Sequence, residues 1–181
     1  MRSREGVMRY LGIALAAGAA LYLMGEGLRA TAAPAAVYSI TDLGSLGGGR
    51  TTPMGINNRG AIVGFSETAD GLTRAFLYAH GSLADLGTLG GDESFAYRIN
   101  DNGLIVGRAQ DLEGRFHAFV TTMTTGAVEL SALGGLGGDF GAARGVNSVG
   151  DVIGYYTTSG DHMSVRNRIF LYRNFRVEDL G

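Results

Sequence analysis

Side chains capable of acid–base chemistry gather in the segments of this chain that are expected to be loops. Glycoside hydrolases use two carboxyl groups about 5 to 10 Å apart, one as a general acid and the other as a base or nucleophile. Candidates for such a pair are Asp92, Glu93, Asp111, Glu113, Asp139 and Asp161. Solvated acids normally lie in loops as well, so we assign no catalytic residue and keep an extracellular glycan-cleaving enzyme as the alternative function.

Metal ligation has weaker support than acid–base chemistry. The three histidines, His80, His117 and His162, fall at different phases of a sequence repeat, which argues against a shared metal site. Residues 134–139 fit part of a calcium-binding nonapeptide, but such sites need adjacent stacked copies, and the match occurs once. We therefore expect no metal, no cofactor and no calcium requirement for folding.

Composition excludes several function classes. Cysteine and lysine are absent, which removes disulfides, thiolate nucleophiles and the lysine of a phosphate-binding loop. The net charge is −2, so the chain lacks the basic surface of a nucleic-acid-binding protein. Glycine supplies 31 of 181 residues beside only two prolines, which favours many turns and bulges between short strands.

A repeat of about 45 residues must position all of these side chains. The pattern Leu-Gly-x-Leu-Gly-Gly at 43–48 recurs at 86–91 and 133–138, at offsets of 43 and 47 residues. Asn57, Asn100 and Asn147 keep the same offsets. The pattern divides a domain spanning 33–181 into three units, at about 44–86, 87–133 and 134–181.

Each unit predicts four short strands, which in the first unit run at about 52–57, 61–66, 74–79 and 82–86. Each of the three asparagines begins an Asn-x-x-Gly segment, which is typical of a type I turn with a left-handed glycine. We expect the asparagines to be structural. The alternative, a ring of amides that reads a ligand, requires them to point into a shared cavity.

Phenylalanine holds one position in the third strand of every unit, as Phe76, Phe119 and Phe170. Core packing is the expected role, because each ring buries a large apolar surface, and a binding platform is the alternative. Two residues earlier stand Arg74, His117 and Arg168, which share a strand face with the phenylalanines.

Four elements recur in fixed order: the run Asp-Leu-Gly-Thr-Leu-Gly-Gly at 85–91, the turn at 99–103, the strand at 105–107 and the triplet His-Ala-Phe at 117–119. Together they resemble the HAF repeat proteins, a bacterial extracellular family named for that triplet. The resemblance covers about 37–181 and departs from the family pattern at Arg74, Arg168, Ala132 and Tyr78. It implies an extracellular location and a propeller-type fold, and it carries over no activity.

The predicted fold is all-β, with three propeller-like blades preceded by a leading strand at 37–43, and a closed β-barrel or sandwich is the alternative. Propellers have about four to eight blades. Three blades would leave unpaired strand edges, above all at 175–180, so we expect a homodimer that completes six blades. A monomer capped by 37–43 is the competing possibility.

Residues 1–32 predict a signal peptide. Arg2, Arg4 and Arg9 precede an apolar run at 11–24, and small residues follow at 30–33. About 14 apolar residues fall short of the roughly 20 that span a membrane, so no membrane attachment is expected after cleavage. The sequence thus favours a secreted, non-enzymatic β-repeat module for binding or surface interaction, with an extracellular glycan or protein as partner.

Overall fold

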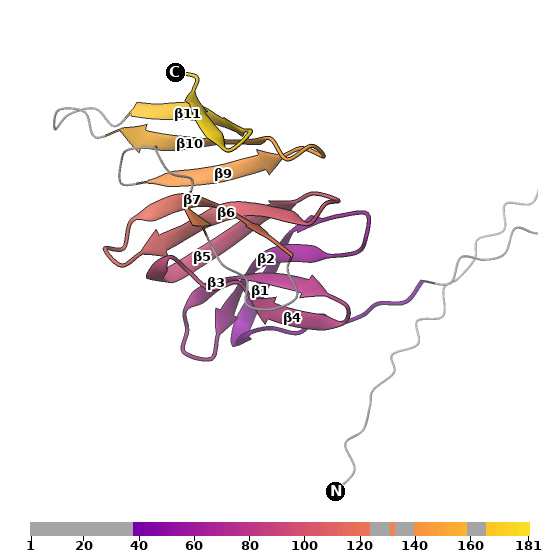
Figure 1. Ribbon diagram of the computed structural model, residues 1–181. Coiled ribbons are helices and arrows are strands. Elements are labelled where there is room, and N and C mark those ends of the chain that lie inside the picture. The colour runs from indigo at the N-terminus through magenta and orange to yellow at the C-terminus, as the bar shows by residue number, and fades with distance from the viewer. Residues whose placement is uncertain (1–37, 124–130, 133–139, 159–165) are drawn as a thin grey trace, which may run out of the picture. The chain divides into compact units, whose positions relative to one another are not determined.

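The computed structural model describes residues 38–123, 131–132, 140–158 and 166–181, and in these ranges it contains strands and no helix (Figure 1). The chain divides into two units, Met1–Ser39 and Ile40–Gly181. All of the described strands belong to the second unit. The predicted signal peptide at 1–32 lies outside the described residues. Among the described residues, no helix has the length and apolar character needed to cross a membrane.

The strands form three antiparallel sheets, each built from four consecutive strands in chain order. The first sheet contains β1 (Gly47–Ile56), β2 (Ile62–Thr68), β3 (Thr73–Ala79) and β4 (Ser82–Asp85). The second contains β5 (Gly90–Ile99), β6 (Leu104–Asp111), β7 (Phe116–Thr122) and β8 (Ser131–Ala132). The third contains β9 (Gly141–Val146), β10 (Val152–Thr158), β11 (Arg166–Arg173) and β12 (Arg176–Asp179). The all-β prediction and the four strands expected in the first unit are confirmed.

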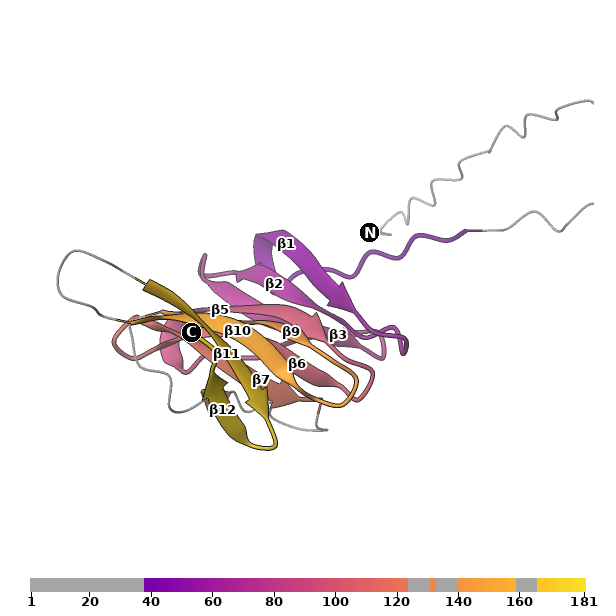
Figure 2. The ribbon, with the colours of Figure 1, turned by 90° about the horizontal axis from the view of Figure 1, so that it is seen from above.

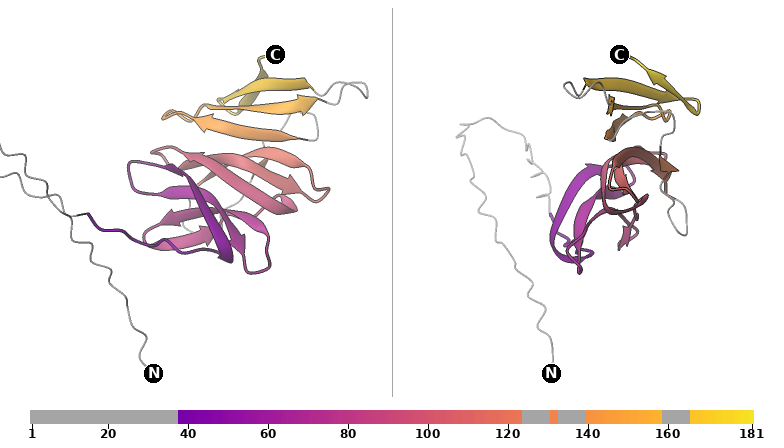
Figure 3. Two further views of the ribbon diagram at one scale, coloured as in Figure 1. Left: turned by 180° about the vertical axis from the view of Figure 1, so that it is seen from behind. Right: turned by 90° about the vertical axis from the view of Figure 1, so that its left-hand side faces the viewer.

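The sheets pack face against face in sequence, with the second sheet between the first and the third (Figures 1 and 3). β5 does not pair with β4 at the edge of the first sheet. It packs across the face of that sheet, against β2 and β3. The described strands therefore form separate sheets and close into no barrel, and the closed-barrel alternative is wrong.

The segments that lead into the first and second sheets share a repeated sequence that forms two successive turns. The Oδ1 atoms of Asp42 and Asp85 accept hydrogen bonds from the backbone N–H groups of Gly44 and Gly87, at 2.9 and 2.7 Å. Both glycines have positive φ angles, 82° and 74°, which a residue with a side chain adopts at a cost. The hydroxyl oxygens of Ser45 and Thr88, one residue further on, accept hydrogen bonds from the backbone N–H groups of Gly47 and Gly90, each at 3.2 Å. Paired side-chain turns thus precede the first strand of each of these two sheets, and the second pair connects β4 to β5.

The leading strand expected at 37–43 is a wrong prediction. Residue 37 lies outside the described residues, and residues 38–45 belong to no strand. The strands that resemble this segment, β4 and β12, each pair with the preceding strand of their own sheet, whereas no strand precedes β1 among the residues that the structure describes. The C-terminal strand is also shorter than 175–180, because Phe175 lies in the β11–β12 turn with φ of 60°.

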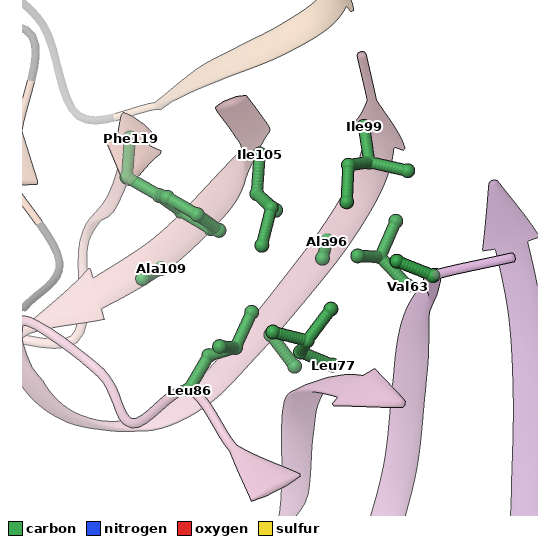
Figure 4. Close-up of a cluster of buried hydrophobic side chains, with 10 residues drawn as sticks. Val63, Leu77, Leu86, Ala96, Ile99, Ile105, Ala109 and Phe119 are labelled. Carbon is green, nitrogen blue, oxygen red and sulfur yellow. The ribbon is translucent and has the colours of Figure 1, made fainter. Parts of the chain in front are cut away.

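The core contains the repeated phenylalanines. Phe76, Phe119 and Phe170 are each 0% exposed, so core packing is confirmed and the binding-platform alternative is wrong. Each ring pairs across the sheet with a glycine of the neighbouring strand, Gly64, Gly107 or Gly154. Between the first and second sheets, Phe119 joins a cluster that includes Val63, Leu77, Leu86, Ala96, Ile99, Ile105 and Ala109 (Figure 4).

Candidate binding surface

A chain of aromatic side chains connects the three sheets. The ring centroids of Phe65 and Phe95 lie 5.1 Å apart, and those of Phe95 and Phe116 lie 6.0 Å apart. Phe140 follows at 5.8 Å from Phe116, and Tyr155 at 5.9 Å from Phe140. All five side chains are partly exposed. We call these five residues the aromatic strip.

The repeat explains how the strip crosses from sheet to sheet. Phe65, Arg108 and Tyr155 occupy the same position of three successive units, directly after the glycine that each core phenylalanine covers. In β2, β6 and β10 this position lies on the strand face opposite to that glycine. One large side chain per unit is therefore held at the same position of the second strand of each sheet. Figure 2 shows these strands, β2, β6 and β10, from above.

Arg108 holds the middle of the strip together. Its guanidinium carbon lies 4.5 Å from the ring centroid of Phe95, 4.3 Å from that of Phe116 and 5.1 Å from that of Phe140. Its Nε atom is buried without a hydrogen-bond partner. Contact between a cation and several ring faces compensates in part for the lost hydration. Arg108 therefore acts as a cationic centre around which three rings are ordered.

A second cation–aromatic contact lies beside the third sheet. Tyr97 and Arg144 are the additional residues of β-bulges at the same repeat position of β5 and β9. The Arg144 guanidinium carbon lies 4.2 Å from the Tyr97 ring centroid, and its Nη2 donates to the Tyr155 hydroxyl at 3.1 Å. Burial raises the pKa of Tyr97 although nearby Arg108 and Arg144 act in the opposite direction, so this phenol stays neutral at physiological pH.

A cavity opens at the end of the strip between the first and second sheets. Its volume is about 280 Å³, and it is lined by Arg50, Phe65, Glu67, Thr73 and Phe95. The two rings form an edge-to-face wall with an interplanar angle of 66°. The Glu67 carboxylate is positioned by a hydrogen bond from the backbone N–H of Gly49 at 3.1 Å. The cavity thus combines an apolar wall with a cation, an anion and a hydroxyl.

The three asparagine turns line a separate depression of about 230 Å³. Asn57 Nδ2 donates to the backbone oxygen of Asn100 at 3.1 Å, and Asn100 Nδ2 donates to that of Asn147 at 2.9 Å. The Oδ1 atom of each asparagine accepts a hydrogen bond from a backbone N–H group of its own turn. The glycines that end these turns, Gly60, Gly103 and Gly150, all have positive φ angles. The chain itself uses these amides, and the prediction that they are structural is confirmed.

Of the candidate carboxylates that can be described, Asp111 and Glu113 have structural partners, and Asp92 and Glu93 lie in β5. Asp111 Oδ2 lies 2.7 Å from His117 Nε2 and 2.9 Å from Arg115 Nη2, and the latter nitrogen also binds Glu113 at 3.0 Å. Partial desolvation opposes ionisation of Asp111, but the hydrogen bonds from His117 and Arg115 prevail and lower its pKa. Asp92 is exposed. The two cavities described above contain one carboxylate each, Glu67 and Asp101.

Three of the candidate residues, Asp139, Asp161 and His162, and the calcium-like segment 134–139 lie outside the described residues. Across the ranges that the structure does describe, no group of three or more histidine, aspartate or glutamate side chains could hold a metal ion. His80 lies exposed in the β3–β4 turn with φ of 53°, where its role is that of a turn residue.

The residue at the triplet's histidine position forms a carboxylate contact in the third unit as well. Arg168 Nε donates to Asp179 Oδ1 at 3.0 Å, and this hydrogen bond, assisted by the N–H of Gly181, lowers the pKa of Asp179 to about 2. A lowered folded-state pKa gives stability that is complete above the ordinary pKa near 4 and is lost as pH falls through the folded value. The window of interest is therefore pH 4 to 2.

We expect Asp179→Asn to be less stable than the parent chain at pH 5 and to approach it as pH falls to 2. Urea unfolding of both chains at several pH values measures this difference. Glu178→Gln, which changes an exposed neighbour whose side chain points elsewhere on the strand, is the matched control. Equal pH dependence in the parent and in Asp179→Asn would contradict the assignment.

Comparison with known proteins adds no relative, since no family model, curated protein or solved structure matches the chain.

Sequence reasoning did not find the aromatic strip, because the side chain at its repeat position changes from phenylalanine to arginine to tyrosine. A detectable signal was present: a large side chain follows the glycine of Ile-Val-Gly in the first two units and of Val-Ile-Gly in the third.

Proposed function

We propose that this chain is a secreted, non-enzymatic β-repeat module of the HAF repeat type, and that it binds an extracellular glycan along the aromatic strip. The observation that carries the proposal is the cavity at the end of the strip, where the rings of Phe65 and Phe95 stand beside Arg50, Glu67 and Thr73. The export pattern in residues 1–32 supports the extracellular location.

The chemistry of the cavity fits a sugar better than other small ligands. A sugar ring has apolar C–H faces and a rim of hydroxyl groups, so it needs a flat apolar wall and nearby donors and acceptors together. Phe65 and Phe95 supply the wall. Arg50 can donate hydrogen bonds, Glu67 can accept them, and the hydroxyl of Thr73 can do both. At about 280 Å³ the cavity lies near the lower end of the roughly 300 to 1,000 Å³ of ligand pockets.

The remaining rings favour an extended ligand. Phe116, Phe140 and Tyr155 continue from the cavity across the second and third sheets in steps of 5.8 to 6.0 Å. Partly exposed rings in sequence offer successive stacking positions to a linear polymer. We therefore propose a polysaccharide rather than a free monosaccharide as the ligand.

The proposed arrangement of the three sheets is propeller-like. Three features support it: each sheet is a four-stranded antiparallel meander, neighbouring sheets pack face to face, and the first strands β1, β5 and β9 adjoin one another. The hydrogen-bonded turns at Asn57, Asn100 and Asn147 follow those first strands at one end. These are the relations that blades have around a central axis.

Native gel electrophoresis through soluble polysaccharides tests the binding proposal. We expect at least one gel containing xylan, galactomannan, mixed-linkage β-glucan or alginate to retard the chain. Phe95→Leu keeps apolar volume but removes the ring. We expect it to weaken the affinity for the retarding polysaccharide about tenfold, the equivalent of one lost ring contact of about 1.4 kcal/mol.

Phe175→Leu is the matched control, because Phe175 is 94% exposed and lies outside the strip. It should leave retardation unchanged. Migration unaffected by all four polysaccharides, or equal loss in both variants, would overturn the proposal. Release of reducing sugar ends from the retained polysaccharide would instead favour the glycan-cleaving alternative.

A further inference from the structure

The third sheet has an apolar face that nothing in the described chain covers. Ile153 in β10 and Ile169 in β11 are 53% and 55% exposed, and Leu180 after β12 is 58% exposed. Ile153 pairs with Leu171, and Ile169 pairs with Tyr155, so these side chains share the face turned away from the second sheet. We call Ile153, Ile169, Leu171 and Leu180 the open tail face.

The same repeat positions are buried in the other sheets. Val63 and Val106, the counterparts of Ile153, are 0% exposed, and Ala75 and Ala118, the counterparts of Ile169, are 0% and 3% exposed. Leu86, the counterpart of Leu180, is 1% exposed. In each case the following sheet covers them. The open tail face is thus a surface whose counterparts bind another sheet of this type.

The asparagine ladder ends at the same place. Asn57 and Asn100 each donate their Nδ2 to the backbone oxygen of the next asparagine turn. Asn147 has no following turn in the described chain, and its Nδ2 donates to Asp151 Oδ2 of its own turn at 3.0 Å. Asn147 Nδ2 therefore occupies the position from which, in the other two turns, the asparagine binds the backbone of the following unit.

The first sheet carries the complementary surface. Ile62 pairs with Tyr78 on the face opposite to Val63 and Leu77, and both side chains are partly exposed. The counterparts of Ile62 in the other sheets, Ile105 and Val152, are 0% exposed because the preceding sheet covers them. We call Ile62 and Tyr78 the open head face.

We propose that the open tail face binds the open head face of a second copy of this chain. The two faces are the halves of the interface that already joins the first sheet to the second and the second to the third, so the occupant is defined by continuity with an established contact. Two copies related by a two-fold axis bury both faces of each at once. The proposed contact is between sheet faces, in place of the contact between strand edges expected from the sequence.

Sedimentation velocity of the purified chain tests this proposal, with Ile169→Arg and Ile62→Arg as variants of the two faces. We expect a concentration-dependent dimer in the parent and at least a tenfold weaker association in each variant. Leu112→Arg is the control, because Leu112 is an equally apolar and 81% exposed residue in the β6–β7 turn. Far-ultraviolet circular dichroism confirms that the variants remain folded.

Mixing the two variants distinguishes head-to-tail contact from tail-to-tail contact. A mixed pair retains one unaltered interface, so we expect dimer to reappear when Ile169→Arg and Ile62→Arg are combined. The proposal would be overturned by a monomer at every concentration, by an open-ended polymer in place of a dimer, by an unaffected Ile62→Arg variant, or by equal effects of Ile169→Arg and Leu112→Arg. Polysaccharide binding is measured separately through the Phe95→Leu variant of the cavity, so failure of one proposal is distinguishable from failure of the other.

Discussion

Replacement of Gly107 by alanine is expected to cost about 3 kcal/mol of folding free energy or more, and to leave little folded protein at 37 °C. A Cβ atom at this position would lie 2.0 Å from the backbone oxygen of Phe95 and 2.7 Å from Cε1 of Phe119. One obstacle is backbone at a bulge and the other is a fully buried ring, so neither can move away at low cost. The repeated glycine thus makes room for the repeated phenylalanine.

Urea denaturation of Gly107→Ala against the parent chain measures this cost. Gly49→Ala is the control, because its Cβ would meet only the Glu67 carboxylate, at 3.7 Å, and its φ angle lies outside the left-handed range. Gly64→Ala and Gly154→Ala face the same obstacles, with backbone oxygens at 2.1 and 2.2 Å, and should behave like Gly107→Ala. A Gly107→Ala chain as stable as Gly49→Ala would show that the packing described here is wrong.

Asn100→Ala is expected to destabilise the chain by about 2 to 3 kcal/mol. Asn100 is only 7% exposed, and the substitution removes two kinds of hydrogen bond at once. The Oδ1 atom accepts from the backbone N–H of Leu104 at 2.9 Å within the turn, and Nδ2 donates to the backbone oxygen of Asn147 at 2.9 Å between sheets. Loss of the first leaves the partly buried N–H group of Leu104 without its acceptor.

Asn100→Asp separates the two contributions, because it keeps the acceptor within the turn and removes the donor between sheets. We expect its loss of stability to be smaller than that of Asn100→Ala and larger than zero. Asn147→Ala should cost less than Asn100→Ala, since Asn147 is exposed and its Nδ2 stays within its own turn. Equal costs at both positions in thermal unfolding would argue against an inter-sheet role for Asn100.

The sequence predicted those parts of the fold that depend on one residue type at a fixed position. An asparagine turn, a left-handed glycine and a buried phenylalanine each admit few substitutes, so they recur visibly in every unit. The asparagines and glycines recur at offsets of 43 and 47 residues, and the phenylalanines at 43 and 51. The strand positions followed from these markers. They also identified the residues whose roles are structural, such as Phe119 and Asn57, before any contact was known.

The parts that depend on contacts between sheets could not be predicted in this way. Phe65, Arg108 and Tyr155 share a position but no residue type, and their common role appears only when the sheets place them around Phe95, Phe116 and Phe140. The segment at 38–43 resembles β4 in sequence, yet a strand also needs a partner, and sequence similarity supplies none. The same reason explains why the sequence indicated a strand edge for self-association, whereas the surface that we propose is a sheet face.

Titration of aromatic NMR signals with the polysaccharide that retards the chain most strongly is the most direct test of the proposed function. We expect changes in the ring signals of Phe65 and Phe95 first, followed by those of Phe116, Phe140 and Tyr155. The rings of Phe76, Phe119 and Phe170 are fully buried and should not change, and Phe175 serves as an exposed reference. Saturable changes confined to Phe175, or to the asparagine turns, with the signals of the aromatic strip unmoved, would contradict it.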